Sequence, residues 1–202
     1  MPYPSHLTMR EARAQYFEDN DFGDDGGYGS AWVDFSIGPI PFPFPNTPMR
    51  VKAVRYHDLH HVLTGYATDF SGEMEIAAWE VGAGCGRFPV AWQLNLSGLV
   101  GGLFSVPFRS FRAFVRGRRS RSLYGRDVER LLGMTVREAQ EELSVPTGGV
   151  QVTAADVAVY LVALAAGIVV GTLTLLLGLA TLPLAYLFLV RRWMRARRAA
   201  HG

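Results

Sequence analysis

The longest apolar stretch of the chain lies near its C-terminal end. Residues 157–190 contain no charged side chain, and five arginines follow within the next eight residues. Because about 18 consecutive apolar residues already suggest a membrane helix, this stretch is more than long enough to cross a bilayer. The alternative is a helix buried in the core of a soluble protein. The pattern predicts a membrane segment with a basic tail over residues 154–199.

The length of this segment raises a question of topology. A helix of 34 residues would be about 51 Å long, whereas the hydrocarbon core of a bilayer is about 30 Å thick. Basic residues favour the cytoplasmic side, and the N-terminus has no apolar run typical of a secretory signal. We therefore expect the soluble domain and the tail on the cytoplasmic side, joined by a helical hairpin that bends at Gly178–Pro183. One long helix is the alternative.

Small residues recur along this segment at a spacing of four, at Ala163, Gly167 and Gly171. A stripe of this kind favours close packing of helices. The packing can occur within the chain or between two copies of it, so a homo-oligomer is one expectation.

Before the membrane segment, the apolar positions follow helical rather than strand periodicity. We expect a helix over residues 50–63 that ends near Gly65, and a second helix from Thr68 or Ser71 to the glycine cluster at 82–86. Amphipathic helices are expected over residues 127–143. The proline-rich residues 37–48 cannot be helical and predict an extended connector. The fold class is therefore mainly α, with a helical soluble domain followed by the membrane segment.

Composition refines this picture at the N-terminal end. Residues 11–34 hold seven acidic side chains against one basic residue, so residues 1–28 are interpreted as a polar, acidic, solvated arm. The helical domain would then occupy residues 29–146. The only cysteine is Cys85, which excludes an intrachain disulfide and a cysteine-based zinc site.

A basic segment balances the acidic one. Residues 109–126 contain seven arginines and no acid. On a helix, an aromatic stripe would lie beside an arginine stripe, as in helices that lie in a membrane interface. The expected lipid head-group ligands are Arg109, Arg112, Arg116 and Arg119. The alternative is a helix packed on the core with a solvated arginine face. Because two basic segments flank the membrane segment, membrane lipid is the expected partner and nucleic acid is not.

Candidate chemistry is concentrated between residues 57 and 73. His57 and His61 are four residues apart and share a helix face, and Asp58 lies beside that face. Two imidazoles and a carboxylate suit zinc, iron or another divalent ion. A short turn near Gly65 would bring Glu73 opposite the histidines. His60 points away, Glu75 and Glu80 are rival carboxylates, and the alternative is a set of ordinary surface or capping residues.

The same residues carry a resemblance. This part of the sequence resembles the H-D-x-x-H-x11-E signature of the coenzyme Q biosynthesis protein 4 family. The matching residues are His57, Asp58, His61 and, after eleven further residues, Glu73. The similarity continues through Gly65, Thr68, Gly72 and Glu80 and covers residues 26–146 more loosely. Position 60 departs from the family, which commonly has a bulky apolar or aromatic residue there. The N-terminal arm and the long apolar segment also lie outside the family pattern.

The resemblance implies a mostly helical protein that works at a membrane in ubiquinone synthesis. His57, Asp58, His61 and Glu73 would inherit a divalent metal, zinc or iron. The implied activity is replacement of the ring carboxylate of a polyprenylated hydroxybenzoate by a hydroxyl, an oxidative decarboxylation. The alternative is a non-catalytic, lipid-binding scaffold that organises other quinone biosynthesis enzymes and keeps the metal for structure. Expected partners are the prenylated precursor and those enzymes.

Overall fold

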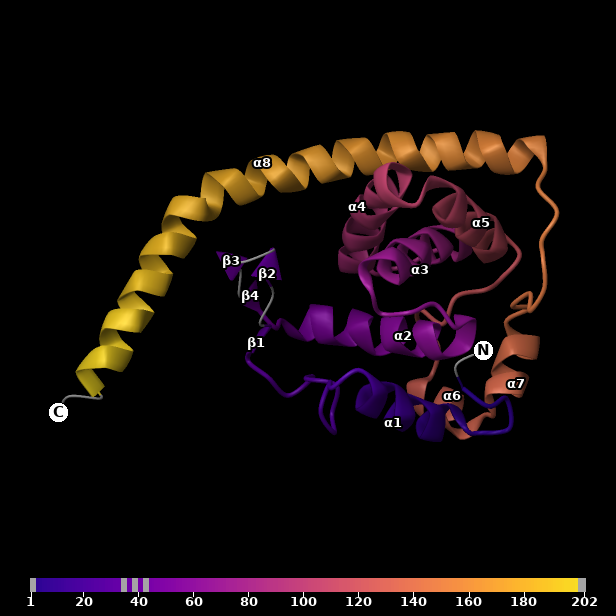
Figure 1. The fold of residues 1–202 in the computed structure, drawn as a ribbon, viewed down its shortest axis with the longest axis horizontal. Helices are drawn as coiled ribbons and strands as arrows, with labels where there is room; N and C mark the ends of the chain where they lie inside the picture. Colours follow the sequence, from indigo (N-terminus) through magenta and orange to yellow (C-terminus); the bar gives the residue numbers. More distant parts are fainter. Residues whose placement is uncertain (1–2, 34–35, 38–39, 42–43, 200–202) are drawn as a thin grey trace.

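Helices account for most of the protein in a computed structural model that describes residues 3–33, 36–37, 40–41 and 44–199. The mainly α fold class is confirmed, with one long apolar helix at the C-terminal end (Figure 1). The helices are α1 Met9–Asp19, α2 Pro48–Thr64, α3 Phe70–Ala83, α4 Pro89–Ser105, α5 Pro107–Arg118, α6 Val128–Gly133, α7 Val136–Glu142 and α8 Ala154–Ala199.

Local signals in the sequence set the ends of α2 and α3. The Thr47 side chain caps the first turn of α2, and Gly65 ends that helix in the left-handed conformation, with φ of 77°. Asp69 then accepts a hydrogen bond from the backbone N–H of Gly72 and begins α3. Both expected helices are confirmed, and the short loop between them folds α3 back over the C-terminal end of α2.

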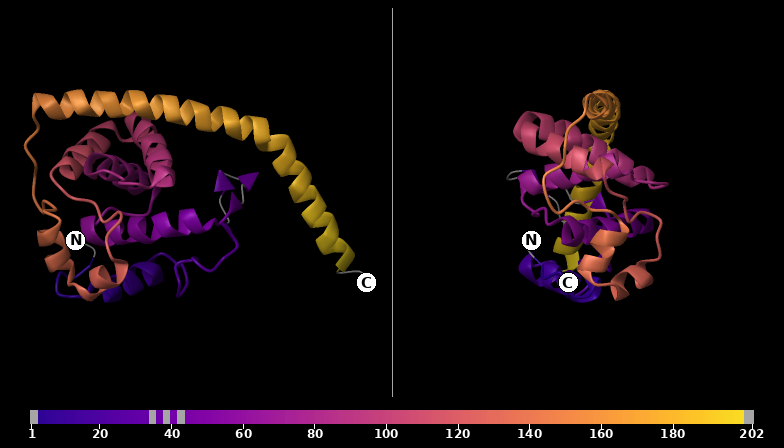
Figure 2. Two further views of the ribbon diagram at one scale, coloured as in Figure 1. Left: turned by 180° about the vertical axis from the view of Figure 1, so that it is seen from behind. Right: turned by 90° about the vertical axis from the view of Figure 1, so that its right-hand side faces the viewer.

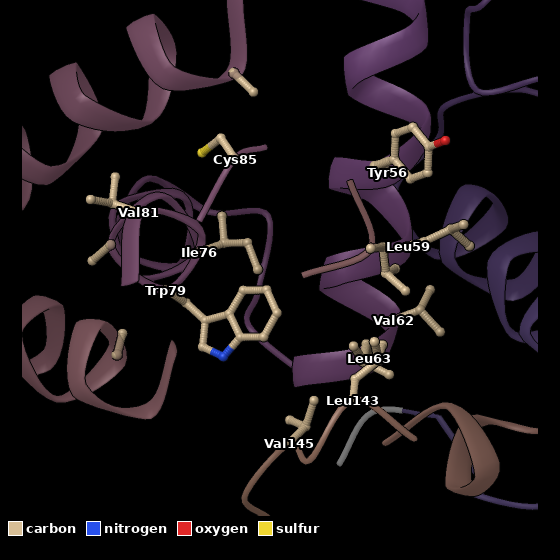
Figure 3. Close-up of a cluster of buried hydrophobic side chains, with 14 of the residues drawn as sticks. Tyr56, Leu59, Val62, Leu63, Ile76, Trp79, Val81, Cys85, Leu143 and Val145 are labelled. Carbon is tan, nitrogen blue, oxygen red and sulfur yellow. The ribbon is translucent and has the colours of Figure 1, made fainter. Parts of the chain in front are cut away.

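One part of the hydrophobic core lies between α2 and α3 (Figure 3). Leu59 and Leu63 of α2 face Ile76 and Trp79 of α3, and all four side chains have no exposed surface. Leu143, which follows α7, closes the lower end of this layer. The two helices that carry the candidate ligands are therefore fixed against each other by close apolar packing.

The N-terminal segment is more ordered than the sequence suggested. Residues 9–19 form α1, which begins with a capping box between Thr8 and Glu11. Its Met9, Tyr16 and Phe17 side chains are buried in the core. The expectation of a solvated arm over residues 1–28 does not describe this helix, because its few apolar residues share one face despite the acidic composition.

In the part of the chain that the structure describes, the strands lie in the proline-rich connector and just before it. Four two-residue strands form two antiparallel pairs, β1 Trp32–Val33 with β4 Phe44–Pro45, and β2 Ser36–Ile37 with β3 Ile40–Pro41. These pairs agree with the extended conformation expected from the prolines. The remaining residues of the connector's expected range, 38–39 and 42–43, lie outside the described residues.

The long helix α8 packs on the domain through its first half (Figures 1 and 2). Asp156, in its first turn, bonds Arg118 at the end of α5 and the next residue, Arg119, at 2.8 and 2.7 Å. Farther along, a Cβ on Gly167 would lie 2.7 Å from the carbonyl oxygen of Leu96 in α4. The small-residue stripe is thus used for packing within the chain.

Helix α8 continues without a break through residues 178–183, so the hairpin is not formed and the alternative of one long helix holds. The missing N–H of Pro183 weakens the helix at that point, and Figure 1 shows α8 bending away from the domain in its second half. By length and composition, residues 154–180 could cross a membrane, and little of that span is buried against the domain.

The docking of α8 on α4 predicts a specific cross-link. A Cβ on Gly171 would lie 3.9 Å from the Ser97 hydroxyl, which is compatible with a disulfide between cysteines at these positions. In a Cys85→Ser background, Ser97→Cys with Gly171→Cys should form this bond under mild oxidation, detected as a mobility shift that a reductant reverses. Ser97→Cys with Leu175→Cys is the control, because Leu175 is exposed. Equal cross-linking in both pairs would contradict the docked arrangement.

Candidate metal centre

Two histidines of α2 and one glutamate of α3 meet at a single point. His57 and His61 are one helical turn apart, and their Nε2 atoms are 3.1 Å from each other. Glu73, in the first turn of α3, places one carboxylate oxygen 3.4 Å from His57 Nε2 and the other 3.3 Å from His61 Nε2. The cluster of His57, His61 and Glu73 could hold a metal ion.

The hydrogen bonds of the other ring nitrogens define which atoms are free to bind. His61 Nδ1 lies 3.0 Å from the carbonyl oxygen of Tyr66, which can only accept. His57 Nδ1 lies 2.9 Å from the Glu80 carboxylate, which also accepts when ionised. Both Nδ1 atoms therefore carry a proton, and each ring keeps Nε2 for a further interaction.

The separation of these Nε2 atoms suits either a shared proton or a metal ion bound by both. Two lone pairs at 3.1 Å repel each other unless a proton or a metal ion lies between them. Zinc bound to imidazole at about 2.0–2.1 Å in tetrahedral geometry separates neighbouring donor atoms by roughly 3.3–3.4 Å. The three donor separations of 3.1–3.4 Å are close to that value. The residues present fit a divalent metal.

The charges around the cluster favour a cation as well. Burial disfavours the protonated His57 ring, but the carboxylates of Glu80 and Glu73 outweigh this and raise the pKa of His57 well above 6.5. Burial also opposes ionisation of Glu73, yet hydrogen bonds from His57 and His61 lower its pKa to about 2. Glu73 is thus ionised at neutral pH and supplies an anionic oxygen ligand.

Asp58 occupies a different position from the other three predicted ligands. Its carboxylate is buried and accepts hydrogen bonds from the hydroxyls of Tyr28, at 2.5 Å, and Tyr16, at 3.4 Å. The Tyr16 ring also stacks on His61, so Asp58 is linked to the cluster through a neighbouring side chain. In the described geometry Asp58 is not part of the group that could hold a metal, and its role as a fourth ligand stays a prediction.

Glu80 forms a buried polar network behind the cluster. It has no exposed side-chain surface and bonds His57, His60, Asn95 and Tyr124. His60 was expected to point away from the ligands, and the structure agrees. The network itself was missed, although Glu80 follows Glu73 by seven residues, a spacing that places both on one face of a helix.

The predicted arginine stripe is largely engaged within the protein. Arg116 donates to the carbonyl oxygens of Thr64 and Pro146, and Arg119 binds Asp156. Arg109 pairs with Glu75, which removes Glu75 from the candidate ligands. Arg112 is exposed. The stripe therefore holds α5 to its neighbours, and its interaction with lipid head groups stays a prediction.

Comparisons with protein-family models, with curated proteins and with solved structures find no match to this chain.

Proposed function

We propose that this protein is a membrane-associated metal-binding protein of prenylated quinone synthesis, acting on a polyprenylated hydroxybenzoate. The proposal combines the resemblance of residues 57–80 to the coenzyme Q biosynthesis protein 4 family with the geometry of the candidate metal centre. The metal is zinc or iron, because imidazole and carboxylate ligands suit both ions. The domain is proposed to lie on the cytoplasmic side of the membrane.

The observation that carries this proposal is the convergence of three donor groups from two helices. His57 and His61 offer Nε2 atoms, and Glu73 offers an ionised carboxylate within 3.4 Å of both. Three protein ligands leave a position open for a substrate oxygen or water, as catalytic metal sites require. A metal held there would polarise a ring carboxylate or phenol, or activate oxygen if it is iron.

The long apolar helix supports a lipid substrate. A prenyl tail loses about 0.8 kcal/mol for each CH₂ group exposed to water, so an enzyme of such substrates must work at the bilayer or cover the tail. Between α4 and α8 lies an apolar groove of about 700 Å³, lined in part by Phe88, Trp92, Leu96 and Leu173. One wall of this groove is a helix that could enter the membrane, so a prenyl tail in the groove would stay covered.

Metal analysis of the purified full chain tests the site directly. Wild-type protein is expected to bind about one equivalent of zinc or iron, whereas His61→Ala and Glu73→Ala should each lose most of it, because each removes one of three donors. His6→Ala is the matched control, since His6 is exposed and lies outside the cluster. Equal metal content in His61→Ala and His6→Ala would remove His61 from the site.

A genetic experiment separates catalysis from scaffolding. A strain that lacks the gene is expected to accumulate a carboxylated prenyl intermediate, and the wild-type gene should restore the quinone. The gene with His57→Ala should not restore it if the metal takes part in the reaction. Restoration by His57→Ala would instead favour the lipid-binding scaffold that keeps its metal for structure.

A further inference from the structure

We propose that Glu80 is the positioning residue that fixes His57 for metal binding, with His60 as its rigid support. The inference rests on the metal function proposed above and adds a residue that does not bind the metal itself. It concerns the buried network of Glu80, His60, Asn95 and Tyr124, none of which belongs to the group that could hold a metal.

Four donors surround the Glu80 carboxylate. Oε1 lies 2.9 Å from His57 Nδ1 and 2.8 Å from His60 Nδ1. Oε2 accepts from the Tyr124 hydroxyl at 2.6 Å and from the Asn95 amide. A buried carboxylate stays ionised only when donors or charges compensate for its lost hydration, and here both oxygens are fully engaged.

His60 fixes the direction of Glu80 Oε1. The backbone N–H of Leu123 donates to His60 Nε2 at 2.9 Å, so that atom must be the acceptor of the ring. The proton of a neutral His60 ring is then on Nδ1 and is donated to Glu80. Since His60 has no exposed surface and its Nε2 is held by the backbone, the position of Oε1 is set from the interior of the domain.

This arrangement controls His57 in two ways. The bond from Nδ1 to Glu80 orients the ring so that Nε2 points to His61 and Glu73, and the carboxylate increases the basicity of Nε2. Carboxylate partners of metal-binding histidines act in this way, and their loss typically weakens metal binding 10- to 100-fold. His61 has its own partner, the Tyr66 carbonyl oxygen, so Glu80 acts on only one of the two histidine ligands, His57.

A residue that only stabilises the fold would affect the network without acting directly on the metal ligand His57. Tyr124 belongs to the same network, but it bonds the other oxygen of Glu80 and its ring packs against His60. Tyr124→Phe therefore disturbs the network without changing the atom that faces the metal ligand. Glu80→Gln keeps the shape and an acceptor oxygen but removes the charge, which makes the two variants a matched pair.

The test measures zinc affinity by competition with a chelator, the visible spectrum of the cobalt-substituted full chain and the thermal unfolding of the metal-free form. We expect Glu80→Gln to bind zinc 10- to 100-fold more weakly than wild type and to change the cobalt spectrum. Tyr124→Phe should stay within about threefold of wild type in zinc affinity. Weakening of zinc binding by the same factor in both variants would overturn the inference, because a structural effect would then explain it.

A second measurement needs no variant. In the zinc-loaded wild-type protein, nitrogen NMR should find the ring proton of both His57 and His60 on Nδ1. A His57 proton on Nε2 would overturn the inference. Failure of the wild type to bind zinc would overturn the metal function together with this inference, whereas normal zinc binding by Glu80→Gln, beside its loss in His61→Ala, would overturn the inference alone.

Discussion

Replacing Gly117 by alanine is expected to destabilise the protein by about 3 kcal/mol or more, at the upper end of the cost of overfilling a packed core. Gly117 of α5 lies against the backbone of α3, and an added Cβ would overlap the carbonyl oxygen of Trp79. Gly82 of α3 makes the reciprocal approach to Phe114 of α5. Because both neighbours are backbone atoms, no side chain can rotate away, and the helices would have to separate.

Chemical denaturation of the detergent-solubilised full chain would measure this effect, with the fluorescence of buried Trp79 contributing to the signal. Gly133→Ala is the control, since nothing lies within 4 Å of a Cβ at that position in α6. The control should change the free energy of unfolding by no more than about 1 kcal/mol. Similar stability of the two variants would contradict the close crossing of α3 and α5.

Zinc affinity is expected to rise with pH from pH 6 upward, by about tenfold for each pH unit until the pKa of His57 is reached. The pKa of His57 is raised well above 6.5: burial opposes the charged ring, but Glu80 and Glu73 stabilise it more strongly. Below that pKa the ring holds a proton on Nε2 that the metal must displace. Displacement of one proton changes affinity about tenfold for each pH unit below that pKa.

Zinc affinity rises with pH, rather than falling, because the ligand that must lose a proton is His57. The pKa of Glu73 is lowered to about 2, so Glu73 is already ionised at pH 6 and contributes no further change. Competition with a chelator of known proton affinity would measure the slope, and affinity should level off once the pH exceeds the pKa of His57. A flat profile from pH 6 to pH 8 would show that metal binding releases no proton from His57.

The sequence predicted α2, α3 and the cluster between them because the signals are local. Gly65 and Asp69 set the turn, and the spacing of His57 and His61 places both on one face. The packing of α1 against the core was not predictable from local signals. It depends on where helices distant in the sequence leave an apolar surface. The partners of Arg116 and Arg119 likewise depend on the positions of α2 and α8, which no periodicity within α5 reveals.

The position of Asp58 shows a related limit. Helical spacing correctly placed its side chain near His57 and His61, but the direction of its carboxylate is set by Tyr16 and Tyr28. These tyrosines come from the segment that composition alone marked as solvated. A pattern within one helix identifies candidate ligands, whereas competition from hydrogen-bond donors elsewhere in the chain decides where each oxygen points.

The attachment of α8 has a consequence for how the domain would be placed at a bilayer. Asp156 binds the start of α8 to α5, and Gly167 allows the helix to pack closely on α4. The domain therefore has a fixed position relative to α8. If α8 inserts into a bilayer, the domain would therefore have one distance from the membrane surface and one tilt relative to it. The distance from the candidate metal cluster to the lipid surface would then be a fixed property of the fold.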